Sequence, residues 1–282
     1  MKRFLFVLGL LIIFNNDFSF AQHDSLLKKG WNPRGVIGVG LSQVALSNWA
    51  KGGENLISIT ANSDFADHYV NYPWILRNTL LFSLGSTKTG SNSFQTNENG
   101  LALENVLVRK IGWAVDPYIS NLIRSTILNG YDYSGDPAIQ TSGFFDPGYV
   151  TQSIGFIFER PFFSTRLGLA FQETFANKFR QYTDDLSTTE TNEAFKFQTG
   201  IESVTGLSVT PAANVLFTSR LRLFSGFETL GIWDVGWDNT ITARVNDFLT
   251  VNLNALVVYE KAQSPYTQLK EGLNLAISYS VF

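Results

Sequence analysis

Polar and apolar residues alternate with a period of two along most of the chain. Residues 249–255 read LTVNLNA, so one face of this segment is apolar and the other carries Thr and Asn. The segments Phe163 to Phe175 and Leu273 to Val281 repeat the pattern. Because successive side chains of a β-strand point to opposite faces, this alternation predicts strands with one apolar and one polar face. We therefore expect an all-β protein.

About twelve such segments follow one another along the chain. They are expected to begin near Val36, Leu56, Trp74, Leu101, Trp113, Val150, Phe162, Ala194, Val215, Trp233, Phe248 and Leu269. Many run for roughly 10 to 14 residues, whereas the usual strand has about 5 to 6. A strand tilted across a bilayer needs about 9 to 11 residues, so the segment length favours strands that cross a membrane.

The connections between these segments alternate between short and long. Short connections are expected at 110–112, 160–161 and 246–247, with somewhat longer turns at 68–73 and 205–213. The connections at 86–100, 128–149 and 176–193 are long and rich in Gly, Ser, Thr, Asn and Asp. Outer-membrane barrels have short periplasmic turns and long external loops. The pattern thus predicts an antiparallel transmembrane β-barrel of about twelve strands over residues 35–282.

Aromatic residues support this prediction, because they gather at the ends of the expected strands. Trp74, Trp113 and Trp233 are examples, and such rings suit the two membrane interfaces. The chain ends on Phe282, a terminal aromatic residue of the kind that the barrel assembly machinery recognises. However, Val281 and not Phe282 is in phase with the apolar face of the last strand. The alternative is a soluble secreted β-sandwich, which buries its apolar faces against each other.

Residues 1–21 have the features of a secretory signal peptide. Lys2 and Arg3 precede an apolar run from Phe4 to Phe14, and Ala21 ends a suitable cleavage site. This run is too short for a transmembrane helix, which needs about 20 residues. We expect residues 22–34 to form a periplasmic N-terminal tail and the mature protein to reside in the outer membrane. Its expected partners are outer-membrane lipid, the barrel assembly machinery during insertion, and another outer-membrane protein.

Composition excludes several other classes of function. Only 16% of the 282 residues are charged, the net charge is -3, and the chain has no Cys. The charge gives no reason to bind nucleic acid. The lack of Cys excludes a disulfide framework, a Cys-based metal site and a Cys nucleophile.

Catalytic chemistry is also poorly supported. The two histidines, His23 and His68, are expected in the N-terminal tail and in a periplasmic turn, away from the external loops. We therefore predict no His-dependent hydrolase, no zinc site, no cofactor and no catalytic residue. Asp184, Asp185, Glu190 and Glu193 form an acidic group that suits either Ca²⁺ or simple exposure to solvent.

Charges of both signs are expected on the face of the strands that lines the lumen. These candidate lumen residues are Asp64, Arg77, Asp116, Arg124, Arg166, Lys196, Glu202, Arg220, Arg222, Asp234, Asp238, Arg244 and Glu260. They fit either a narrow hydrated pore or a lumen that ion pairs pack shut. We therefore expect a non-enzymatic structural or accessory subunit of an outer-membrane assembly. The alternative is a narrow passive channel for small solutes or ions.

One run of residues resembles a known family. Gln43, Asn48-Trp49 and Gly52-Gly53-Glu54-Asn55 are similar to the opening signature of an uncharacterised family of Bacteroidetes outer-membrane proteins, a domain of unknown function. Residues 145–155 and 165–168 also resemble it, whereas Thr87-Lys88-Thr89-Gly90 departs from the family's usual acidic stretch. The resemblance implies an outer-membrane barrel along nearly the whole mature chain, and it supplies no activity or ligand.

The same run is expected at the first external hairpin. Gly52 and Gly53 permit the positive φ that tight turns require, and Asn48 suits such a turn. Trp49 is expected either to anchor the rim of the barrel or to contact a partner.

Overall fold

The computed structural model describes residues 28–47, 53–184, 193–261 and 263–280. Within this part of the chain, twelve antiparallel strands close into a barrel in which β1 pairs with β14. The barrel strands are β1 (Gly30–Val44), β2 (Leu56–Asn71), β3 (Trp74–Thr89), β4 (Gln95–Arg109), β5 (Asp116–Ser125), β8 (Gly148–Arg160), β9 (Phe163–Phe175), β10 (Phe195–Ala212), β11 (Val215–Gly226), β12 (Asp234–Arg244), β13 (Leu249–Tyr259) and β14 (Gln268–Ser280). The predicted all-β antiparallel barrel of about twelve strands is confirmed.

The remaining elements lie in the connections. Strands β6 (Gly130–Asp132) and β7 (Ile139–Ser142) form a small hairpin between β5 and β8. Two 3₁₀ helices, η1 (Arg180–Tyr182) and η2 (Phe227–Thr229), follow β9 and β11. Among the described residues, no helix has the length and apolar character needed to cross a membrane.

Strand β1 begins earlier than expected. Its first residues, Gly30 to Arg34, pair with Val70 to Ala66 of β2, so the expected boundary between tail and barrel at residue 35 is too late. The alternation is hidden there because Pro33 interrupts it. Proline lacks an N–H group, but among the described residues Gly30 to Arg34 pair only with β2, since the pairing of β1 with β14 starts at Val36.

The connections follow the predicted alternation in length except between β3 and β4. Residues 86–89 and 95–100 of the long loop expected there lie in the two strands, and only residues 90–94 connect them. Short turns join β2 to β3, β4 to β5, β8 to β9, β10 to β11 and β12 to β13, and they define what we term the turn end. The other connections define the opposite, loop end. Two expected turns lie too early: His68 is inside β2, and residues 205–212 are inside β10. The actual turns are at Tyr72-Pro73 and Ala213-Asn214.

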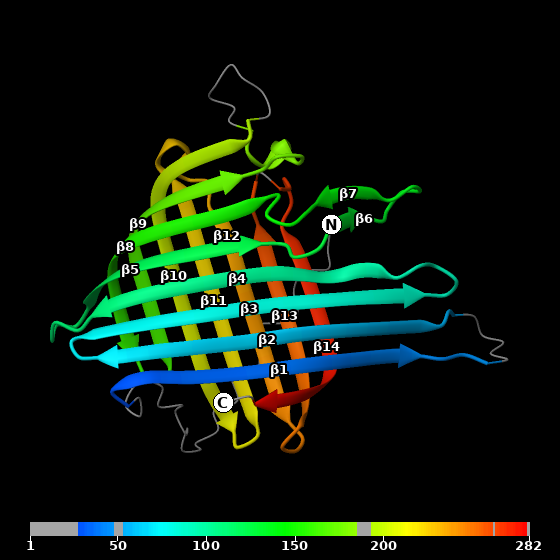
Figure 1. The fold of residues 1–282 in the computed structure, drawn as a ribbon, viewed down its shortest axis with the longest axis horizontal. Helices are drawn as coiled ribbons and strands as arrows, with labels where there is room; N and C mark the ends of the chain where they lie inside the picture. Colours follow the sequence, from blue (N-terminus) through cyan, green and yellow to red (C-terminus); the bar gives the residue numbers. More distant parts are fainter. Residues whose placement is uncertain (1–27, 48–52, 185–192, 262, 281–282) are drawn as a thin grey trace, which may run out of the picture.

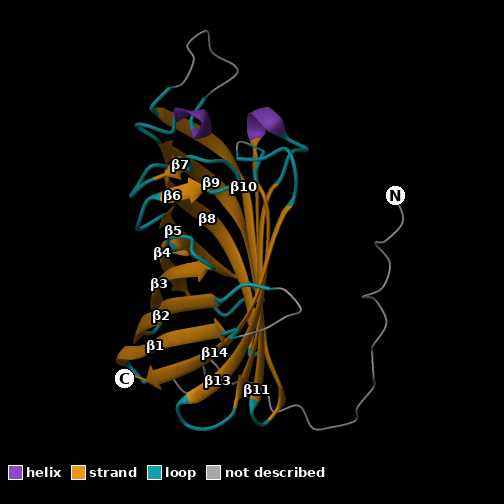
Figure 2. Ribbon diagram, turned by 90° about the vertical axis from the view of Figure 1, so that its right-hand side faces the viewer, coloured by secondary structure: helices purple, strands orange, loops and turns teal. Residues whose placement is uncertain are grey.

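The barrel has two walls whose strands cross at a steep angle. Strands β1–β5, β8 and β9 run across the front of Figure 1, and β10–β14 run from top to bottom behind them. The view from the side shows β10–β14 as a curved layer beside the front strands (Figure 2). Side chains from the two walls therefore meet in the lumen between them.

The apolar face of the strands points outward. Leu273 and Ile277 of β14 are 68% and 63% exposed, whereas Thr151 and Ser153 of β8 are 1% and 2% exposed inside the barrel. This arrangement is the reverse of a soluble sandwich, in which the apolar faces would be buried. Large aromatic side chains lie exposed at the turn end, including Tyr72 and Trp113. The fold is that of an outer-membrane β-barrel.

Candidate functional site

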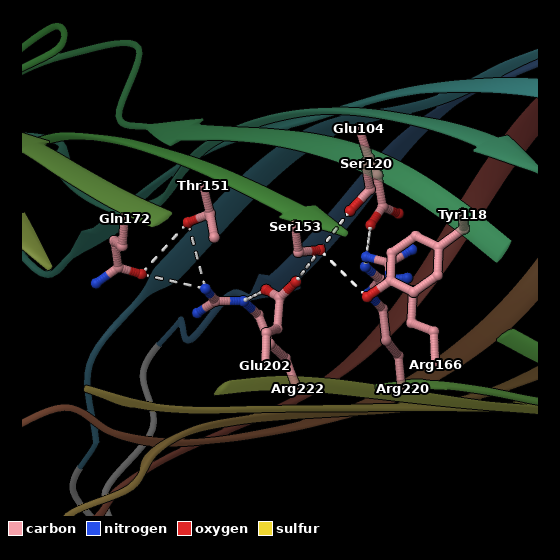
Figure 3. Close-up of polar contacts among 10 residues, drawn as sticks. All are labelled: Glu104, Tyr118, Ser120, Thr151, Ser153, Arg166, Gln172, Glu202, Arg220 and Arg222. Atoms are coloured by element: carbon pink, nitrogen blue, oxygen red, sulfur yellow. Dashed lines mark hydrogen bonds and ion pairs between the residues drawn. The ribbon is translucent and has the colours of Figure 1, made fainter. Parts of the chain in front are cut away.

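An acidic side chain in the middle of the lumen binds arginines from two other strands. The carboxylate of Glu104 on β4 accepts hydrogen bonds from Arg166 on β9 and from Arg220 on β11, the latter at 2.7 Å. Five strand pairings separate β4 from β11 around the barrel. Glu104 therefore links the front wall to the back wall (Figure 3).

A second cluster lies nearer the loop end. Arg222 on β11 donates from Nε to Glu202 Oε1 on β10 at 2.7 Å, and Ser153 on β8 donates to Glu202 Oε2 at 2.9 Å. Arg222 Nη2 also donates to Gln172 Oε1 at 3.1 Å and to Thr151 Oγ1 at 3.3 Å. Both charges are buried, and each has several polar partners, as buried ion pairs require.

Tyr118 and Ser153 connect the two clusters. The hydroxyl of Tyr118 lies 3.3 Å from Ser153 Oγ, and Ser120 Oγ lies 2.7 Å from the same atom. The guanidinium carbon of Arg166 is 5.7 Å from the centre of the Tyr118 ring. The lumen network is defined here as the residues labelled in Figure 3, namely Glu104, Tyr118, Ser120, Thr151, Ser153, Arg166, Gln172, Glu202, Arg220 and Arg222.

A pair of glycines makes room for this network. Gly155 of β8 and Gly168 of β9 are directly opposite each other. A Cβ atom on Gly168 would lie 2.6 Å from the Tyr118 hydroxyl and 2.5 Å from the carbonyl oxygen of Ile154. A side chain at this position would therefore displace Tyr118, and Gly leaves room for the Tyr118 hydroxyl.

A further ion-pair group lies at the turn end of the same region. Arg77 contacts Glu159 at 2.6 Å, and Lys110 contacts Glu159 at 2.7 Å and Asp116 at 3.1 Å. Partial burial lowers the pKa of Lys110, but its bonds to Glu159 and Asp116 outweigh this effect and raise the pKa above 10.5. Between this group and Glu104 lies a cavity of about 150 Å³, lined by Arg77, Glu104, Glu159, Arg166 and Arg220 among others.

The opposite side of the lumen is different. There, β12, β13, β14, β1 and β2 present Ser, Thr, Asn and Gly at many inward positions, and the hydrogen bonds between these polar side chains link neighbouring strands. The same strands also carry charged residues, and one of them, Lys270 of β14, pairs with Glu98 of β4 at 2.6 Å. Asn254 donates to Thr240 at 2.7 Å, and Thr242 donates to Asn252 at 2.9 Å. We term these side chains the amide sector, and the inward side chains of β4, β5 and β8–β11 the charged sector.

The structure places the predicted lumen charges in several groups. Arg166, Glu202, Arg220 and Arg222 meet in the lumen network, and Arg77 and Asp116 lie in the ion-pair group at the turn end. The others are dispersed: Arg124 stacks on Tyr149, Lys196 donates to the carbonyl of Asp184, Glu260 accepts from Gln263, and Asp64, Asp234, Asp238 and Arg244 occupy inward positions on β2 and β12.

Sequence reasoning missed Glu104, Glu159, Lys110 and Tyr118. Glu104 is hidden because its inward neighbours Ala102 and Val106 are apolar, whereas Asn105 is on the outward face. The register of β4 against β3 would have revealed it, but the alternation alone does not.

The remaining predicted residues lie mostly outside the described ranges. Asn48, Trp49, Gly52 and Phe282 are outside them, as are His23, Asp185 and Glu190. Gly53 has φ +119°, as expected for a turn that depends on Gly. Within the described residues, no group of three or more His, Asp and Glu side chains is arranged to hold a metal ion.

Comparison with known families adds one match at the N-terminal part of the barrel. Residues 41–131 match the model of a family described as a protein of unknown function, DUF3078. The resemblance to an uncharacterised domain is thus confirmed. The DUF3078 match covers β2 to β5, and its Bacteroidetes origin stays a prediction. No curated protein matches the chain.

Several solved outer-membrane barrels are similar in fold. An outer-membrane channel from Pseudomonas putida F1 has a TM-score of 0.42 and 11% identity, over 90% of this chain and 96% of that one. The translocator domain of the autotransporter NalP from Neisseria meningitidis has a TM-score of 0.37 and 9% identity, over 90% of both chains. With such low scores, these neighbours carry no information on the activity of this chain.

Proposed function

We propose that this protein is a non-enzymatic β-barrel of the outer membrane that serves as a structural or accessory subunit of an outer-membrane assembly, with a lumen closed to solutes. The observation that carries this proposal is the two salt bridges that Glu104 forms with Arg166 and Arg220. These arginines come from different strands and reach across the lumen. Side chains held in this way leave little room for a permeating solute.

Burial of the neighbouring groups supports a closed state. Arg166 is 6% exposed, Glu202 1% and Tyr118 2%, so water has little access to this section of the lumen. The apolar outer face suits outer-membrane lipid, and the predicted signal peptide suits export and insertion by the barrel assembly machinery.

Conductance of the folded protein in a planar bilayer tests the closed lumen, with heat-shifted gel mobility as the check of folding. We expect the native barrel to be silent. Glu104→Gln removes the charge that holds both arginines, and we expect it to produce discrete conductance steps. The matched control is Glu228→Gln, at an exposed position in η2, which should stay silent. Steps from the native barrel would overturn the closed lumen.

The accessory role has its own test. Purification of the native protein from its own membranes in mild detergent should yield a partner at fixed stoichiometry. Recovery of the barrel without any such partner, in several detergents, would overturn the accessory role and leave a purely structural one.

A second candidate function, a narrow channel for small solutes or ions, is favoured by open space beside Arg220 of the charged sector and Gly236 of the amide sector. Arg220 is 44% exposed at its side chain, and a Cβ atom on Gly236 would meet no atom within 4 Å. If native conductance were observed and Arg220→Gln shifted its ion selectivity, the channel would replace the closed barrel.

A further inference from the structure

A row of polar side chains crosses the outer face of the front wall. Asp67 on β2 is opposite Asn78 on β3, which is opposite Asn105 on β4. Asn105 is in turn opposite Asn121 on β5, and Asn121 is opposite Gln152 on β8. These five residues, which we term the outer polar row, occupy outward positions because the residues beside them, such as Glu104 and Ser153, face the lumen.

The row lies inside the apolar belt of the barrel. On its turn-end side, Leu76, Leu107, Ile119 and Ile154 form a continuous outward row across β3, β4, β5 and β8. On its loop-end side, Leu80, Leu103, Ile123 and Val150 form another. Since apolar side chains flank it on both sides, the outer polar row lies at the depth of the hydrocarbon and not at the rim.

Hydrogen bonds within the barrel satisfy this row only in part. Asn105 Nδ2 donates to Asn78 Oδ1 at 2.8 Å, and Asn78 Nδ2 donates to the carbonyl of Asp67 at 3.2 Å. Oδ1 of Asp67 is buried without a hydrogen-bond partner. Among the described residues, the side-chain amides of Asn121 and Gln152 have no hydrogen bond. Such groups are costly in lipid, where no water can replace the missing partner.

The back wall provides the comparison. The outward residues of β13 are Leu249, Val251, Leu253, Ala255 and Val257, all of them apolar. The front wall also has a groove of about 270 Å³ beside the row, lined by Pro33, Phe65, Asp67, Asn78, Leu80 and Leu103 among others. The front wall therefore has polar side chains and a groove, as a surface that contacts another protein does. The outward face of β13 is apolar throughout, as a surface that faces lipid is.

We propose that the outer polar row is an interface with a second copy of this chain in the membrane. This inference rests on the membrane placement in the proposed function. A carboxamide both donates and accepts hydrogen bonds, so a surface of Asn and Gln is complementary to itself in a two-fold contact. Interhelical amide bonds stabilise other membrane assemblies in the same way.

Geometry indicates which residues meet. Two copies inserted in the same direction are related by a two-fold axis along the membrane normal. The row runs at right angles to the strands, which are tilted, so it is oblique to this axis. The rows of the two copies therefore cross each other near their middle. Asn105 is the middle residue of the five, so Asn105 and its neighbour Asn121 are expected closest to the second copy.

Disulfide cross-linking tests the contact, because the chain has no Cys of its own. Asn105→Cys and Asn121→Cys are oxidised separately in vesicles that contain the folded barrel and in native outer membranes. The matched control is Leu253→Cys, an outward position on the back wall that is 44% exposed. We expect a product of twice the chain mass from at least one row variant and none from the control.

Three results would overturn the proposal. They are monomer from both row variants, equal cross-linking of the control, and a cross-link to a protein of another mass, which would assign the row to a different partner. A barrel that does not insert into vesicles would instead contradict the proposed function. Insertion without dimer contradicts the interface alone.

A second measurement keeps the proposal falsifiable if the Cys variants fold poorly. The double variant Asn105→Leu with Asn121→Leu makes the row more apolar, which favours a lipid-facing barrel. We expect it to fold and to weaken the pairing of two differently tagged copies roughly tenfold or more, the loss of one to two hydrogen bonds. Unchanged pairing would overturn the interface.

Discussion

The charged sector and the amide sector line the same lumen but hold it in different ways. In the charged sector, Arg220 on the back wall reaches Glu104 on the front wall, so the bonds cross the lumen. In the amide sector, Asn254 bonds to Thr240 on the next strand, so the bonds follow the wall. The comparison teaches that polar side chains connect the two walls only where they are long enough to reach from one wall to the other.

Side-chain length explains this difference. Arg and Glu extend their charged groups several bonds from the backbone, and Arg presents donors in a fork that can serve two acceptors at once. Arg222 does so with Glu202 and Gln172. Asn and Thr are shorter, and in the amide sector Asn254 and Thr242 bond to the strand beside them.

The largest expected effect comes from breaking the buried pair of the charged sector. Glu202→Ala leaves the guanidinium of Arg222 buried without its counter-charge, and we expect a loss of about 3–5 kcal/mol in the free energy of unfolding. Urea unfolding in lipid vesicles measures it. Glu228→Ala, at an exposed position in η2, is the control and should change little. If Glu202→Ala lowered the free energy of unfolding no more than Glu228→Ala does, the charged sector would not hold the two walls together.

A smaller effect on the free energy of unfolding is expected from replacing one glycine in each sector by alanine. A Cβ atom on Gly168 would lie 2.5 Å from the carbonyl oxygen of Ile154, whereas one on Gly236 would meet nothing within 4 Å. Gly168→Ala should therefore cost about 1–3 kcal/mol of unfolding free energy, and Gly236→Ala should be neutral or stabilise by about 0.5 kcal/mol. Equal effects in the same unfolding assay would remove the distinction between a packed and an open side.

The smallest effect is expected in the amide sector. Asn254→Ala removes the bond to Thr240 and should cost about 0.5–1.5 kcal/mol. A double-mutant cycle with Thr240→Val measures this bond, because the two losses should not add if the side chains interact. Additive losses would mean that the bond contributes nothing to the unfolding free energy.

Much of the fold was predictable because a barrel repeats one local rule. The alternation in Leu249 to Ala255 and the short turn near Arg160 located strands and connections without knowledge of their partners. Failures occurred where the local rule is broken. Pro33 hid the start of β1. Strand β10 continues to Ala212, through most of the turn that was expected at residues 205–213.

The site was less predictable than the fold. Arg220 and Arg222 were expected in the lumen from alternation alone, but their partners were not. Glu104 lies 116 positions from Arg220 along the chain, and no local pattern connects the two. Asn105 and Asn121 were likewise unremarked, because each is a single polar residue in an apolar face until the register aligns them.

Period-two alternation in the chain specified the strands, their approximate number and the presence of one polar and one apolar face, since these depend on neighbours in sequence. It did not specify which face points outward, because alternation is the same whether the apolar face points into the barrel or away from it. Closure of β1 on β14 settled this by placing the apolar face outside. Closure and register also brought Glu104 to Arg220 and aligned the outer polar row, because they bring together residues that are far apart in the chain.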